Sequence, residues 1–165
     1  ELQKLSNQLR NFDGIKAVIP PKNLTVTLRD YQQFGLDWLM FLHQFRFGGI
    51  LADDMGLGKT IQTLSLLMKL KEQRKLLQPS LIIVPTSLIG NWKVEIEKFT
   101  PKLKYLALYG NDRGIKFRDI DKVDIVFTTY NLVVRDFEFL EKKSFEYIIL
   151  DEAQKIKNPT SKATQ

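Results

Sequence analysis

The pattern of apolar and polar positions along the chain predicts helices that alternate with short strands. In residues 1–12, 31–45 and 87–99, apolar side chains recur every three or four positions and would share one face of a helix. A more apolar stretch over residues 59–73 and a shorter one over residues 132–140 are also expected to be helical. Ser87 has a side chain that can cap the helix following it.

Runs rich in apolar residues predict the strands. They lie at residues 47–52, 81–84, 104–109, 124–128 and 147–150. Short apolar strands that alternate with helices are typical of a parallel sheet with helices on both faces. The sequence therefore predicts an α/β fold built on such a sheet.

The chain is expected to have two parts. Residues 1–23 would form a leader, with a short helix and a linker that Pro20 and Pro21 keep irregular. Residues 24–165 are long enough to form a domain with its own apolar core. Because the sequence starts without Met and stops in a polar, helix-like stretch, we expect it to be a piece of a longer protein.

Composition excludes several kinds of site. The 165 residues contain no Cys and a single His, His43, which excludes disulfides, thiolate zinc sites, thiol catalysis and multi-histidine metal sites. The formal net charge of +6 is spread along the chain, so by itself it fits an ordinary solvated surface as well as an anionic partner. No apolar run is long enough to span a bilayer, so no membrane partner is expected.

The segment from Asp53 to Thr60 has the features of a phosphate-binding loop. It ends in Gly-Lys-Thr between a predicted strand and a predicted helix, although Asp53 stands where the strict pattern has Gly. Gly56 and Gly58 allow backbone N–H groups to point at a phosphate near the helix start. Lys59 can reach the outer phosphates, and the Thr60 hydroxyl can bind Mg²⁺. The alternative is an ordinary glycine turn, which the predicted strand and helix on either side argue against.

A second candidate element is the apolar run that leads into Asp151 and Glu152. In parallel α/β sheets, ligands bind at the carboxyl ends of the strands, where these acids would lie. Asp151 could hold Mg²⁺, and Glu152 could orient and polarise an attacking water. The alternative is a solvated acidic turn. The phosphate loop precedes the acids in the expected chain order, which argues against this alternative.

Five segments in this order resemble the motifs of SWI/SNF-type ATPases, the helicase-like double-stranded DNA translocases of superfamily two. The segments are residues 28–32, 52–60, 83–92, 128–130 and 151–154, and the resemblance covers about residues 24–160. It implies a RecA-like P-loop sheet that forms the first lobe of a two-lobed motor. Residues 1–23 resemble the leader of bacterial members, which implies a cytoplasmic, nucleoid-associated protein.

The resemblance assigns roles to individual residues. Gln32 would read adenine; the alternative is an exposed helix residue. The implied catalytic residues are Lys59, Asp151 and Glu152, and the implied Mg²⁺ ligands are Thr60 and Asp151. ATP would be bound by Arg29, Gln32, Asp54, Met55, Gly56, Leu57, Gly58, Lys59 and Thr60. Double-stranded DNA would be contacted through its backbone by Thr86, Ser87, Asn91, Thr128, Thr129 and Tyr130. Tyr31 and Trp92 are expected to serve packing, and Lys155 and Lys157 match a basic pair that could equally be a solvated face.

The sequence departs from the family pattern in two respects. Gln154 stands where many members have His, which puts in doubt how nucleotide state is coupled to DNA. The second lobe, which supplies arginines to the nucleotide, is absent, as is a strand expected between the phosphate-loop strand and the acidic strand. We therefore expect ATP hydrolysis in a full-length parent and little from this chain alone. The alternatives are an RNA or single-strand helicase lobe, a nucleotide switch or small kinase, and an inactive interaction fragment.

Overall fold

The computed structural model describes residues 13–54 and 56–156, with Lys155 described by its backbone alone. The predicted helix over residues 1–12 lies outside this part, and residues 14–21 form the irregular linker that the two prolines predict. The helices are α2 (Asp30–Phe45), α3 (Lys59–Glu72), α4 (Ile89–Phe99), α5 (Arg113–Lys116), α6 (Tyr130–Arg135) and α7 (Phe137–Leu140), and the 3-10 turns are η1 (Thr86–Leu88), η2 (Phe117–Lys122) and η3 (Ala153–Ile156). The strands are β1 (Ser80–Ile83), β2 (Tyr105–Ala107), β3 (Ile125–Thr128) and β4 (Ile148–Leu150).

The four strands form one parallel sheet in the order β2-β3-β1-β4. Strand β1 lies in the middle, and its residue Ile82 is in register with Phe127 of β3 and Ile149 of β4. All four residues of β1 and of β3 are buried, which explains why these strands appear in the sequence as unbroken apolar runs. The predicted α/β class with a parallel sheet is confirmed.

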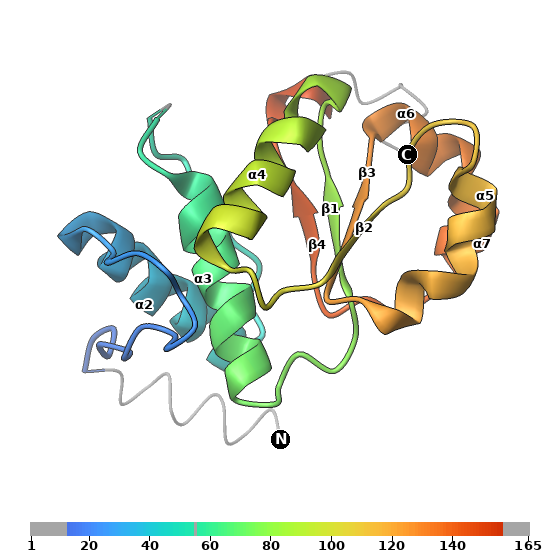
Figure 1. Ribbon diagram of the computed structural model, residues 1–165. Coiled ribbons are helices and arrows are strands. Elements are labelled where there is room, and N and C mark those ends of the chain that lie inside the picture. The colour runs from blue at the N-terminus through green and yellow to red at the C-terminus, as the bar shows by residue number, and fades with distance from the viewer. Residues whose placement is uncertain (1–12, 55, 157–165) are drawn as a thin grey trace.

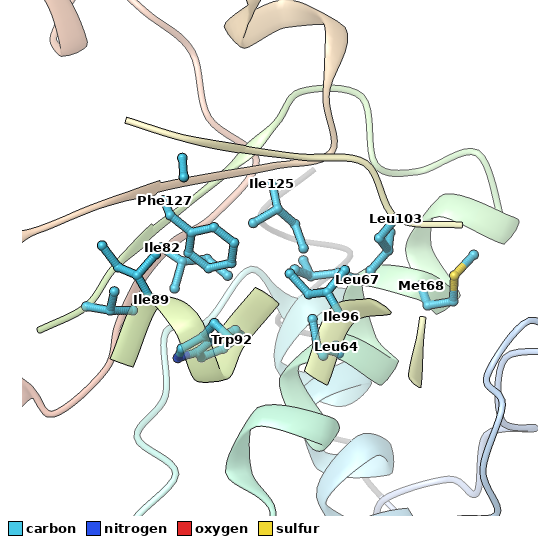
Figure 2. Packing of buried hydrophobic residues seen from close by; sticks show 12 residues of the cluster. Leu64, Leu67, Met68, Ile82, Ile89, Trp92, Ile96, Leu103, Ile125 and Phe127 are labelled. Atoms are coloured by element: carbon cyan, nitrogen blue, oxygen red, sulfur yellow. The ribbon is translucent and has the colours of Figure 1, made fainter. Parts of the chain in front are cut away.

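Helices cover both faces of the sheet (Figure 1). On one face, α3 and α4 enclose the larger apolar cluster; on the other, η2 and α7 enclose a smaller one. Helix α2 packs on the outer side of α3 through Leu36, Leu66 and Leu70. Figure 2 shows the larger cluster, in which Trp92 and Ile96 of α4 lie with Leu64 and Leu67 of α3 below Phe127.

The predicted strand over residues 47–52 is wrong. Residues 47–54 are irregular, and Ile50 is 85% exposed. A strand needs a hydrogen-bonded neighbour, and the sequence prediction assigned that neighbour to residues after the acidic motif. Among the described residues no such strand is present, and the sheet ends at β4. For the same reason β4 is an edge strand with Ile148 63% exposed, although its apolar sequence predicted a buried one.

Two local predictions also fail. The helix expected over residues 132–140 is split at Asp136, whose carboxylate accepts bonds from Arg113, Nε to Oδ2 at 2.9 Å and Nη2 to Oδ1 at 3.2 Å. Ser87 does not cap a helix, because residues 86–88 form a 3-10 turn and α4 begins after Leu88 without a side-chain cap. The short elements α5 and η2 had no clear apolar pattern to predict them.

We expect Phe127→Ala to destabilise the fold by about 3–5 kcal/mol, because Phe127 is fully buried between Trp92 and Tyr105 and the surrounding side chains cannot close the cavity. Urea unfolding measures the change. Val94→Ala, at a 62% exposed position of α4, is the control and should shift stability by no more than about 0.5 kcal/mol. Equal losses from both variants would contradict the assigned core.

Candidate functional site

The acidic motif and the segments after β1 and β3 meet at the carboxyl edge of the sheet. Because the strands are parallel, the segments that follow β1, β3 and β4 all leave the sheet at this edge. Backbone bonds join them directly: the N–H of Asp151 donates to Ile83 at 2.9 Å, and that of Val84 donates to Thr128 at 3.0 Å. The acidic motif is therefore held beside the two segments predicted to touch DNA.

The loop that ends in Lys59 leads directly into helix α3. Gly56 and Gly58 both have positive φ, +85° and +80°, a conformation that side chains with a Cβ rarely adopt. The Lys59 ammonium donates to the backbone carbonyls of Asp53 at 2.6 Å and Asp54 at 3.0 Å. The loop thus folds back on its own lysine at the start of a helix, where the helix dipole favours an anion. Met55 lies outside the described residues.

Gln32 links helix α2 to this loop. Its Nε2 donates to the carbonyl of Leu57 at 3.3 Å, while its Oε1 accepts from the backbone N–H of Arg29 at 3.0 Å. Tyr31 is 39% exposed beside it, so the packing role expected for Tyr31 is wrong. Arg29 and Gln32 are therefore close to the phosphate loop although they lie more than twenty residues before it. No local pattern in the sequence predicts this proximity.

Asp151 and Glu152 follow β4 and differ in their surroundings. The carboxylate of Asp151 accepts a bond from the indole Nε1 of Trp92 at 2.8 Å, and its backbone carbonyl accepts one from the Tyr130 hydroxyl at 2.7 Å. Glu152 has φ +53°, a left-handed conformation uncommon for a residue with a side chain, and it accepts a bond from Gln154. Strain of this kind is frequent at functional positions.

Helix α4 contributes two residues that the sequence reasoning missed as site residues. Trp92 is 4% exposed, so the expectation of buried packing is confirmed, but its N–H also holds Asp151. Glu95, one turn later, lies near Thr60 and Asp151. Burial raises the pKa of Glu95, the Thr60 side chain acts against this rise, and the nearby charge of Asp151 adds to it. Their spacing of three within an amphipathic helix was the only available signal.

The residues predicted to touch DNA divide into two groups. Thr86, Ser87 and Asn91 are exposed around the start of α4. Thr128 and Thr129 are 1% and 6% exposed, so their side chains face the interior. Tyr130 is half-buried, and its pKa is raised first by burial and then by the negative charges of Asp151 and Glu152.

The oxygen atoms of Thr60 and Asp151 fit a magnesium ion. Mg²⁺ prefers hard oxygen ligands and is commonly held by one or two protein groups, with substrate phosphates and waters completing its shell. Across residues 13–54 and 56–156, no cluster of three or more His, Cys, Asp or Glu side chains could form a cage for a metal.

None of the described helices combines the length and apolar character needed to cross a membrane.

Known proteins resemble this chain in sequence. The model of a family described as "SNF2-related domain" matches residues 31–165. A protein named Helicase swr1 from Emericella nidulans is 46% identical over 157 residues, which are 92% of this chain and 9% of that protein. Helicase domino from Drosophila melanogaster is 40% identical over 99% of this chain and 5% of its own length. The chain therefore spans about a tenth or less of these relatives.

The fold has a counterpart among solved structures. The Sulfolobus solfataricus SWI2/SNF2 ATPase core in complex with dsDNA superposes with a TM-score of 0.82 and 40% identity, over 90% of this chain and 30% of that one. The Sulfolobus solfataricus SWI2/SNF2 ATPase core domain gives a TM-score of 0.79 at 39% identity. These eukaryotic and archaeal relatives support the SWI/SNF resemblance but not the expectation of a bacterial, nucleoid-associated member.

We expect Gly58→Ala to destabilise the chain by about 1–3 kcal/mol, because alanine would have to adopt the left-handed conformation. The added Cβ would also lie 2.6 Å from Nε2 of Gln32. Gly114→Ala is a matched control with the opposite expected effect. Gly114 lies in α5 with open space around it, so alanine there should stabilise the fold by up to about 1 kcal/mol. Urea denaturation measures the free energy of unfolding of both variants. Equal changes in the two variants would contradict the loop geometry.

Proposed function

The chain belongs to the SNF2-related domain family, and from this premise we propose that it binds ATP with Mg²⁺ as the first lobe of a two-lobed, DNA-stimulated ATP hydrolase. The observation that carries the proposal is that both motifs lie against helix α4. The indole Nε1 of Trp92 donates to Asp151 of the acidic motif at 2.8 Å, and α3, which begins with Lys59 and Thr60 of the phosphate loop, packs against the same helix in the larger apolar cluster.

The phosphate loop would bind the nucleotide by exchanging partners. Lys59 now donates to two carbonyls of its own loop, and phosphate oxygens would replace them as acceptors. The left-handed glycines turn backbone N–H groups toward the same space at the start of α3. Gln32, already in contact with Leu57, would present its amide to the adenine edge, with Arg29 beside it.

Hydrolysis would use the acidic motif. Asp151 and Thr60 would hold Mg²⁺, which neutralises charge on the phosphates when bound. Glu152 would orient and polarise the attacking water from its left-handed position next to Asp151. The arginines that stabilise the transferring phosphoryl group would come from the second lobe, so turnover is proposed for the two-lobed protein.

Double-stranded DNA is the proposed partner of the exposed residues around η1 and the start of α4. Thr86, Ser87 and Asn91 carry hydroxyl and amide groups suited to phosphate oxygens, and such contacts position a protein without selecting sequence. The SWI2/SNF2 core that this chain resembles was solved with dsDNA, which supports the choice of a duplex.

We expect Lys59→Ala to weaken binding of a fluorescent ATP analogue to this chain at least tenfold, because the charge-assisted bonds to the phosphates are lost. Titrations in magnesium buffer measure the affinity. Lys69→Ala removes an equal charge from the same helix, away from the loop, and should leave the affinity within about twofold, a change near thermal energy. Unchanged affinity in Lys59→Ala would remove the basis for the loop assignment.

We expect Glu152→Gln in the two-lobed protein to keep ATP binding and to lower turnover by about 10²–10⁴-fold, the usual contribution of a general base. Phosphate release is measured with duplex DNA, with single-stranded RNA and without nucleic acid. In the unaltered protein, duplex DNA should give the larger stimulation. Equal stimulation by the RNA would favour a helicase acting on single strands.

A further inference from the structure

Helix α4 reaches the proposed magnesium ligand Asp151 from the side of the larger apolar cluster. The indole Nε1 of Trp92 donates to Oδ2 of Asp151 at 2.8 Å. The two residues are 59 positions apart, so no local pattern in the sequence brings them together.

The packing of α4 fixes the Trp92 side chain in place. Ile89, Trp92 and Ile96 are buried in the larger apolar cluster, and the Trp92 ring lies 5.8 Å from that of Phe127 (Figure 2). A tryptophan ring held by the core has little freedom, so its N–H points in a defined direction. Packing alone would be satisfied by any large apolar ring, whereas the bond to Asp151 requires the indole nitrogen.

We propose that Trp92 is a positioning residue of the magnesium site, because its indole N–H fixes the carboxylate of Asp151. The inference rests on the proposed function, because it concerns the same metal. Outer partners of metal ligands orient them and commonly change metal affinity by about 10–100-fold when removed. Asp151 keeps its second carboxylate oxygen for the metal while Oδ2 is held.

The test compares nucleotide binding with Mg²⁺ and with a chelator. Trp92→Phe keeps an aromatic ring and loses the donor. In this variant we expect the Mg²⁺ concentration needed for half-maximal binding of the ATP analogue to rise about tenfold or more, while affinity in chelator stays unchanged. Trp38→Phe makes the same chemical change in α2 and should leave the Mg²⁺ dependence unaltered.

The Mg²⁺ dependence separates positioning from packing. Loss of packing at Trp92 would lower the stability of the fold without changing how much Mg²⁺ nucleotide binding requires. An unchanged Mg²⁺ dependence in Trp92→Phe would therefore overturn the role of Trp92.

The nucleotide-free chain offers an independent readout. The NMR resonance of the Trp92 indole N–H should move in Asp151→Ala, while that of Trp38 stays in place. A Trp92 resonance that does not respond would overturn the contact in solution. If the unaltered chain shows this coupling and yet binds no nucleotide, the proposed function fails while the hydrogen bond stands, so the two failures are distinguishable.

Discussion

Parallel pairing of β1 with both β3 and β4 is the constraint on which the candidate site depends. Residues of β1 are in register with both neighbours, so the three strands end together at one edge of the sheet. The backbone bond from Asp151 to Ile83 continues this ladder by one residue beyond β4. The acidic motif therefore owes its position to main-chain geometry, and side chains adjust only the direction of its carboxylates.

Helix α4 connects this edge to the phosphate loop because one face of it serves two purposes. Its apolar residues bury themselves against α3 and the sheet, which sets the distance between the helix and both elements. A polar group at the margin of that face, the Trp92 N–H, then meets the Asp151 carboxylate after β4. Burial of such a group is tolerable only because it is hydrogen-bonded.

The sequence could predict what depends on local periodicity and on short motifs. The helical repeat gave α2 and α4 closely, and the apolar runs gave β1, β3 and β4 to within one or two residues. It failed where a distant partner decides the outcome. Residues 47–52 have strand composition, yet among the described residues no strand lies beside them. The predicted helix over residues 132–140 is interrupted at Asp136, whose carboxylate is bound by Arg113, twenty-three positions earlier. The bond from Trp92 to Asp151 likewise joins segments that no spacing rule relates.

The conformation of Lys59 bears on how such a loop can be ordered without its ligand. A lysine ammonium with no acceptor would either extend into solvent or repel the partial positive charge at the start of α3. Bonds to the carbonyls of Asp53 and Asp54 avoid both, and they also restrain the chain before the glycines. Binding an anion then exchanges one set of charge-assisted hydrogen bonds for another. The net gain in binding free energy is therefore smaller than the energy of the new bonds alone. In return, the lysine is already confined to the loop, which lowers the entropic cost of capturing a phosphate.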